Sequence, residues 1–319
     1  MSLASGGLVT FRQDRRHGNT TCESYMPARL ISFVNCKGGV GKTSVVVNIA
    51  GVLAHDLDLR VLVVDCDAQA NASSWLMGLG HFRDSYSVEN STFGVLTAKA
   101  PFLQNAIRRS VVQIKGQIQI PKLDLLPAVY ELVDVEDGLA MNGDLVPFLA
   151  KFYETLKAIV HDYDYILFDC PPHVFRATQA ALFASREIYV PCNPDPLSDR
   201  GLSLLSKRML AFYHLVQSSR FQMVGHRLAK IRGIILNNVP RGNIEHLIGT
   251  LSNKLNYLRQ EHSYVCQDAA ILPTRIRHTV AATKVIEEDV PFILSRNNPD
   301  LREDYVNLAR YIHHTPMLP

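Results

Sequence analysis

The chain has 319 residues, and 47% of them are hydrophobic, which suffices for the core of one large α/β domain or of two small ones. No apolar run approaches the roughly 18 residues of a membrane-spanning helix, and the polar N-terminus lacks the pattern of a secretory signal. The net charge of +3 averages over an uneven distribution of charge along the chain.

The predicted strands and helices alternate along the chain. Before them, residues 1–28 are interpreted as a flexible N-terminal tail, which leaves 29–319 as a single domain. Apolar runs predict buried strands at 30–34, 60–64, 123–126, 165–168, 187–190 and 233–236, with helices between them, for example at 43–54, 146–160 and 201–215. This alternation predicts a doubly wound α/β fold, with a mostly parallel sheet and helices on both faces. In such sheets ligands bind at the carboxyl ends of the strands.

A glycine-rich loop joins the first predicted strand to the first predicted helix. Glycines let the backbone N–H groups of such a loop approach a phosphate, a lysine then reaches the β- and γ-phosphates, and a hydroxyl binds Mg²⁺. Lys42 and Thr43 stand at these two positions. We therefore predict ATP and Mg²⁺ as cofactors, held by Gly38, Gly39, Val40, Gly41, Lys42, Thr43 and Ser44.

The segment 37–43 resembles the deviant Walker A motif of the ParA/MinD family of P-loop ATPases, although Cys36 occupies the first glycine position of the general P-loop pattern. In that family the early lysine, here Lys37, reaches the phosphates of the partner subunit in an ATP-sandwiched homodimer. The resemblance implies that Lys37 binds ATP and acts in catalysis like an arginine finger. A solvent-facing loop lysine is the alternative interpretation.

Two further segments that resemble family motifs follow strand ends. Residues 61–72 keep the two acids of the second motif, with alanines in place of its usual Pro and Gly. The resemblance implies that Asp67 orients the attacking water and that Asp65 helps to hold Mg²⁺; exposed loop aspartates are the alternative. Residues 165–172 keep the pattern D-x-P-P, which implies that Asp169 binds Mg²⁺ through water.

Weaker matches continue toward the C-terminus. Asn237 follows a predicted strand at the place where the family contacts adenine, and an ordinary turn asparagine is the competing interpretation. Residues 191–202 resemble a segment that lines the family's dimer interface. Residues 271–277 resemble a C-terminal region in which ParA proteins carry a DNA-binding arginine, here Arg277.

Positive charge is concentrated between Arg200 and Lys284. This stretch holds thirteen Lys and Arg against three Asp and Glu, a net charge of +10, which leaves −7 for the rest of the chain. Such a segment forms either a solvated face or a salt-sensitive contact surface for a polyanion. We predict nonspecific DNA as the polyanion, with contacts from Arg232, Lys254, Arg259, Arg275, Arg277 and Lys284.

The ParA branch of the family accounts for these features together. It implies a weak, partner-stimulated, Mg²⁺-dependent ATP hydrolase that forms a homodimer when it binds ATP. The dimer would bind nonspecific DNA, which places the protein in the cytoplasm and on the nucleoid. With a ParB-like centromere-binding or adaptor protein it would partition or position a DNA or other cargo. A MinD-like, membrane-associated ATPase is one alternative, but residues 301–319 lack a basic polar face, so we expect no membrane binding. A metabolic P-loop enzyme that activates a small substrate with ATP is another. The six cysteines show no C-x-x-C spacing and are interpreted as reduced structural thiols.

Overall fold

The computed structural model describes residues 28–100, 102–136, 144–219, 226–279, 291, 294 and 298–318. The predicted N-terminal tail lies outside the described residues except for Ala28, and the predicted DNA contact Lys284 also lies outside them.

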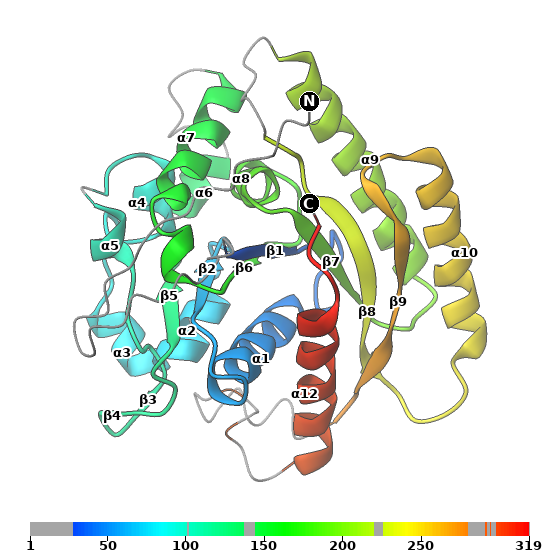
Figure 1. Ribbon diagram of the computed structural model, residues 1–319, viewed down its shortest axis with the longest axis horizontal. Helices are drawn as coiled ribbons and strands as arrows, with labels where there is room; N and C mark the ends of the chain where they lie inside the picture. The colour runs from blue at the N-terminus through cyan, green and yellow to red at the C-terminus, as the bar shows by residue number, and fades with distance from the viewer. Residues whose placement is uncertain are drawn as a thin grey trace, which may run out of the picture.

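A seven-stranded sheet in the order β5-β2-β6-β1-β7-β8-β9 organises the fold (Figure 1). All of its neighbouring strands run parallel, which confirms the predicted fold class. The strands are β1 (Arg29–Phe33), β2 (Val61–Asp65), β5 (Leu123–Leu126), β6 (Tyr165–Asp169), β7 (Glu187–Cys192), β8 (Lys230–Val239) and β9 (Val265–Arg277). A separate antiparallel hairpin consists of β3 (Gln113–Ile114) and β4 (Gln117–Ile118). The hairpin and β9 were not predicted from the sequence.

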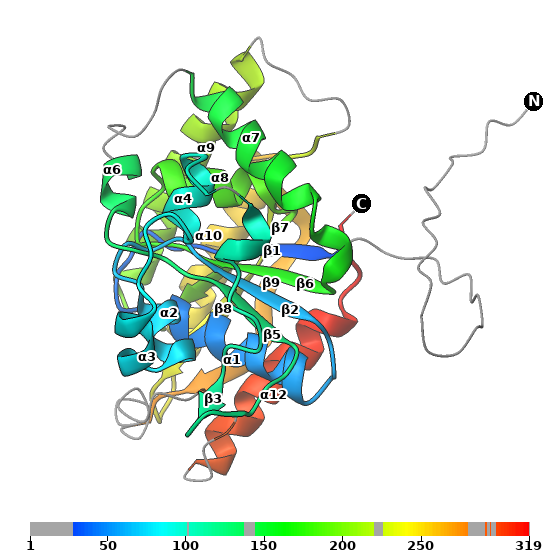
Figure 2. The same ribbon diagram turned by 90° about the vertical axis from the view of Figure 1, so that its left-hand side faces the viewer.

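Helices cover both faces of the sheet (Figure 2). One face carries α1 (Lys42–His55), α2 (Asn71–Met77) and α12 (Pro299–His314). The other carries α7 (Leu145–Lys157), α8 (Arg176–Ala184), α9 (Ser198–Ser218) and α10 (Glu245–Glu261). Short elements complete the connections, namely α3 (Leu79–Asp84), α4 (Thr92–Leu96), α5 (Leu103–Ala106), α6 (Leu132–Glu136) and the 3₁₀ turn η1 (Val160–Asp162). None of the helices in the described ranges is long and apolar enough to cross a membrane.

The central strands are apolar on both faces because helices cover both faces. In β1, Leu30 packs into the core under α7 to α10, whereas Ile31 and Phe33 pack into the core under α1 and α12. The alternation of side chains along a strand thus divides the interior into two hydrophobic layers.

The strand order places one crevice at the carboxyl end of β1. From β1 the chain continues to β2 on one side of the sheet, and it later returns to β7, β8 and β9 on the other. Connections that leave a central strand in opposite directions open a ligand crevice at its carboxyl end. The glycine-rich loop begins at this point.

Candidate nucleotide-binding site

The loop between β1 and α1 has the backbone conformation of a phosphate cradle. Gly39 and Gly41 have φ angles of 71° and 77°, left-handed values that favour glycine. The helix α1 begins at Lys42 with no side-chain cap and no acidic residue in its first turn. Its first-turn N–H groups and its dipole are therefore suited to an anion.

Asn237, at the end of β8, braces this loop. Its side chain is buried, and its Nδ2 donates a hydrogen bond to the carbonyl oxygen of Val40 at 2.9 Å. A Cβ atom on Gly41 would lie 2.0 Å from the same Nδ2, so glycine is required there for steric reasons as well as for its φ angle. The proposed adenine contact of Asn237 stays a prediction, and the structure adds this bracing role.

Lys37 is held within its own chain. Its backbone N–H donates to Asn35 Oδ1 at 2.9 Å, and its ammonium forms an ion pair with Asp195, in the turn after β7. Asp195 Oδ1 also accepts the N–H of Leu197 at 2.8 Å. Partial burial raises the pKa of Asp195, but the contacts with Lys37 and Leu197 outweigh it and lower that pKa below its ordinary value. Asp195 was not predicted from the sequence; its place in the loop after the predicted strand 187–190 was the available signal.

Lys42 and Asp169 form the buried electrostatic centre of the site. Burial lowers the pKa of Lys42, while Asp169 and Asp67 act against this shift. Burial and the neighbouring Asp65 raise the pKa of Asp169 well above its ordinary value. Among the described residues no donor makes a hydrogen bond of good geometry to either oxygen of Asp169, although Lys42 and Thr43 lie close enough to favour its charged form. A buried carboxylate in this state is suited to a cation, and Mg²⁺ fits this oxygen donor.

Asp65 lies directly beside Asp169 in the register of β2 and β6. Both of its carboxylate oxygens are engaged: Oδ2 accepts the N–H and hydroxyl of Ser73 at 2.9 and 2.7 Å, and Oδ1 accepts the N–H of Asp67 at 3.1 Å. Burial raises the pKa of Asp65 to about 7 against the lowering effect of the Ser73 bonds. These bonds fix the orientation of the Asp65 carboxylate beside Asp169, and its metal role stays a prediction. Asp67 is only partly buried, and its Oδ1 accepts the N–H of Gln69 at 3.0 Å.

A cavity of about 530 Å³ opens beside Asp67, between the loop after β6 and α6. Glu136 lines it; its Oε1 accepts the N–H of Ala177, in the first turn of α8, at 3.1 Å, while its Oε2 has no partner in the described part of the chain. Burial raises the pKa of Glu136 to about 7. His173 also lines the cavity, and burial lowers its pKa. Neither residue was predicted, because nothing in the sequence links α6 to the loop after β6.

Three of the predicted DNA-binding residues, Arg232, Arg275 and Arg277, form ion pairs within the chain. The side chain of Arg232 is 8% exposed and forms an ion pair with Asp268 at 2.6 Å. Arg277 donates to Asp304 at 2.7 and 2.9 Å and forms an ion pair with Asp300 at 2.9 Å. These contacts join β8 to β9 and β9 to α12.

The other described residues of that set lie on or beside α10. The ammonium of Lys254 lies 5.3 Å over the ring centre of Tyr257. Arg275 forms an exposed ion pair with Glu245 at 3.1 Å. Arg259 and Arg275 line one groove between α10 and β9. The structure therefore brings together the phosphate-loop residues, the three aspartates and Asn237, whereas the role of the predicted DNA contacts stays a prediction.

Comparison with known proteins agrees with this geometry. A family model described as an AAA domain matches residues 28–222, more than half of the chain. The sporulation initiation inhibitor protein Soj of Bacillus subtilis is 34% identical over 191 residues, which cover 59% of this chain and 67% of Soj. The chromosome partitioning protein ParA of Caulobacter vibrioides is 31% identical over 217 residues, which cover 68% of this chain and 72% of that protein. Among solved structures, apo McdA of Cyanothece has the same fold, with a TM-score of 0.65 and 18% identity over 89% of this chain and 99% of McdA. The chain therefore belongs to the ParA-type family of P-loop ATPases.

Proposed function

We propose that this chain binds Mg-ATP, forms a homodimer around the nucleotide, and hydrolyses ATP slowly to partition or position a DNA or other cargo with a partner protein. The observation that carries the proposal is a buried pair of charged groups: the Asp169 carboxylate, whose oxygens have no hydrogen-bond partner among the described residues, and Lys42, which begins a helix with no side-chain cap. A triphosphate and a magnesium ion would compensate both features at once.

Each residue of the site has a distinct part in this proposal. Lys42 and the first-turn N–H groups of α1 would hold the β- and γ-phosphates, and Thr43 and Asp169 would hold Mg²⁺, which neutralises charge on the phosphates when bound. Asp65 would keep the metal waters oriented through its fixed carboxylate. Asp67 borders open space, so it would orient the water that attacks the γ-phosphate.

The surface around the loop supports dimerisation. Tyr130, Phe175 and Leu197 are 69%, 45% and 53% exposed, and they lie in the loops that follow β5, β6 and β7. An apolar patch formed by these side chains at the carboxyl edge of the sheet would be typical of an interface. Lys37 lies at the same edge, so in the dimer it would exchange Asp195 for the phosphates of the partner subunit.

Exposed cations on α9 support DNA binding. Lys207 and Arg208 are exposed on this helix, which packs against α10, the helix that carries Lys254. Together they offer charge that no salt bridge within the described residues takes up. A duplex would contact such a surface through its phosphates, without sequence preference and with strong salt dependence. This interaction would place the protein on the nucleoid.

Sedimentation velocity with Mg-ATP and Mg-ADP tests the nucleotide and dimer steps. We expect an ATP-dependent dimer for the wild type, a trapped dimer for Asp67→Ala and a monomer without nucleotide affinity for Lys42→Ala. Lys37→Ala should bind ATP without forming the dimer. A wild-type protein that stays monomeric in Mg-ATP, or a Lys42→Ala variant that keeps its ATP affinity, would refute the assignment.

Duplex binding is tested separately, by gel shift with nonspecific DNA at increasing salt. Retention with ATP should disappear between roughly 50 and 200 mM salt. Duplex retention that is insensitive to salt and nucleotide would refute the DNA step and leave the ATPase assignment standing.

A further inference from the structure

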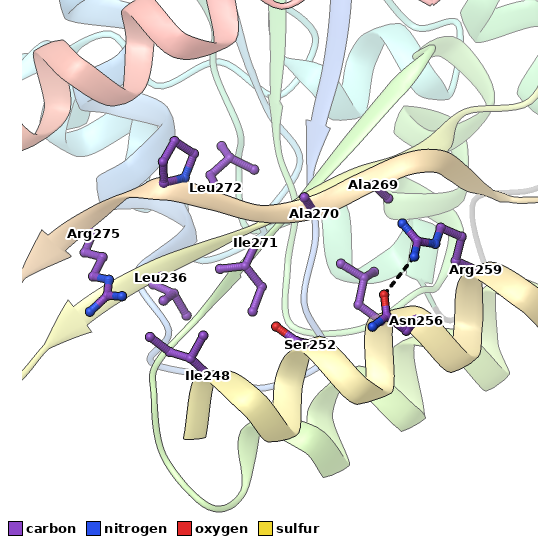
Figure 3. A pocket seen from close by; sticks show the side chains of 12 residues that line it. Leu236, Ile248, Ser252, Asn256, Arg259, Ala269, Ala270, Ile271, Leu272 and Arg275 are labelled. Carbon is purple, nitrogen blue, oxygen red and sulfur yellow. Dashed lines mark hydrogen bonds between the residues drawn. The ribbon is translucent and has the colours of Figure 1, made fainter. Parts of the chain in front are cut away.

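A groove of about 390 Å³ runs between α10 and the edge strand β9 (Figure 3). Its floor is apolar, with Leu236 buried and Ile248 and Ile271 half-buried. An arginine stands at each end: Arg275 lies near Ile248, and Arg259 lies near Asn256 (Figure 3). The groove lies beyond residue 222, where the matching family model ends.

Both arginines are available to bind a carboxylate of another molecule. Arg259 donates to two neutral oxygens, Asn256 Oδ1 at 2.9 Å and the carbonyl of Gln267 at 3.1 Å, and neither contact neutralises its charge. Arg275 pairs with Glu245, but their side chains are 45% and 66% exposed, and such surface pairs exchange readily. The groove therefore combines an apolar floor with a cation at each end.

We propose that this groove binds an acidic segment of a partner protein, with an apolar side chain seated against Ile248 and Ile271 and carboxylates at Arg259 and Arg275. In protein interfaces a buried apolar side chain supplies much of the binding energy, and complementary charges around it supply specificity. Ser252 and Asn256 lie on the α10 side of the groove and offer hydrogen bonds to the peptide backbone.

Side-chain docking fits the groove better than the addition of a strand to β9. Pro273, which also lines the groove, carries no N–H, so it removes one donor from this edge strand. The pairing of β9 with β8 is interrupted by register shifts, and such irregular edges resist strand addition.

The groove is also less suited to duplex DNA than the exposed cations of α9. A duplex presents phosphates to a protein surface and has no aliphatic side chain to place against Ile248 and Ile271. Phosphate contacts at Arg259 and Arg275 would leave this floor exposed to water. An acidic peptide uses both the charges and the floor.

The test is fluorescence anisotropy on the full chain with labelled probes of equal length. The probes are peptides that alternate Glu with Leu, Glu with Ser, or Lys with Leu, together with a nonspecific DNA duplex. The variants are Arg259→Glu, its milder form Arg259→Gln, and Ser252→Trp, which fills the groove without a change of charge. Arg310→Glu is the matched control, because it makes the same charge reversal at an exposed position of α12, on the opposite face of the sheet.

The Glu–Leu peptide should bind the wild type, and Arg259→Glu and Ser252→Trp should each weaken it by about tenfold or more. The Arg310→Glu variant should bind it like the wild type. No binding of Glu–Leu, or equal binding of Glu–Ser, would overturn the proposal. Duplex binding that is lost in both Arg259→Glu and Ser252→Trp would instead assign the groove to DNA. Mg-ATP affinity reports whether each variant is folded. If Arg259→Glu loses Mg-ATP affinity, peptide binding by Arg259→Gln and Ser252→Trp decides whether the groove is the binding site. A wild type that does not bind Mg-ATP would refute the proposed ATPase but not the peptide-binding groove.

Discussion

Replacing Gly41 by alanine tests whether Asn237 shapes the phosphate loop. The φ angle of Gly41 is 77°, and the new Cβ would lie 2.0 Å from Asn237 Nδ2. Asn237 is 2% exposed, and its Nδ2 donates to the carbonyl of Val40. The amide therefore cannot move aside without breaking that hydrogen bond.

The two effects can be given separate magnitudes. A left-handed conformation costs alanine about 1–2 kcal/mol more than glycine. Displacement of Asn237 leaves buried polar groups without partners, which costs about 1–3 kcal/mol. Gly41→Ala should therefore lower the free energy of unfolding by roughly 2–5 kcal/mol. In an Asn237→Ala background only the backbone cost of about 1–2 kcal/mol should remain.

Urea unfolding of the wild type, the two single variants and the double variant measures this difference. The double-mutant cycle should give a coupling free energy of about 1–3 kcal/mol between Gly41 and Asn237. Isothermal titration should also show weaker Mg-ATP binding for Gly41→Ala. Strictly additive free energies would show that the amide does not constrain the loop and would refute the reasoning.

Three further predictions concern other contacts of the fold. Asp195→Ala frees Lys37 from its ion pair, so the ATP-dependent dimer should form at a roughly two- to fivefold lower protein concentration than in the wild type. Sedimentation velocity measures this concentration, and an unchanged or higher value would contradict the prediction. Glu136 has a pKa raised from 4.5 to about 7 in the folded state, so its ionisation disfavours folding as the pH rises through this range. In urea, Glu136→Gln should accordingly have the same free energy of unfolding as the wild type at pH 4.5 and a higher one at pH 8, by at most about 3 kcal/mol. A difference in this free energy that is equal at both pH values would refute the raised pKa of Glu136. Arg277→Ala removes the guanidinium bonds to Asp304, which keeps the backbone N–H of position 277, and should lower the free energy of unfolding by about 1 kcal/mol. Lys254→Ala, as control, should change it little.

The sequence predicts a strand where the apolar run is continuous, because such strands are covered on both faces. Residues 123–126 are predicted without error, and residues 165–168 lack only the final Asp169. The strand β9 was missed because it lies at the edge of the sheet, where exposed residues and Pro273 interrupt the apolar pattern. Its burial follows no simple alternation, since its register shifts against β8. In such an irregular edge strand the alternation of apolar and polar residues is too weak to predict the strand from the sequence.

In the nucleotide-binding site, residues that are close together in the sequence were predicted, whereas contacts between distant segments were not. The phosphate loop is predictable because its glycines, Lys42 and Thr43 are contiguous. The contacts that set its shape join segments far apart in the chain: Lys37 and Asp195 are separated by 158 positions, and Val40 and Asn237 by 197. They meet only because the strand order places β7 beside β1 and β8 beyond it, and strand order was not predicted.

The charge of the basic segment shows how folding redistributes what a sequence count suggests. Arg277 contributes to the net +10 of residues 200–284, yet it is paired with Asp300 and Asp304, which the fold brings in from α12. A cation with two acidic partners offers little attraction to a phosphate, because the field of the pair cancels beyond a short distance. The exposed cations of α9, such as Lys207, keep their full effect although no motif distinguishes them. The capacity of this segment to bind a polyanion therefore depends on which of its cations the fold leaves without an acid, and not on the number counted along the chain.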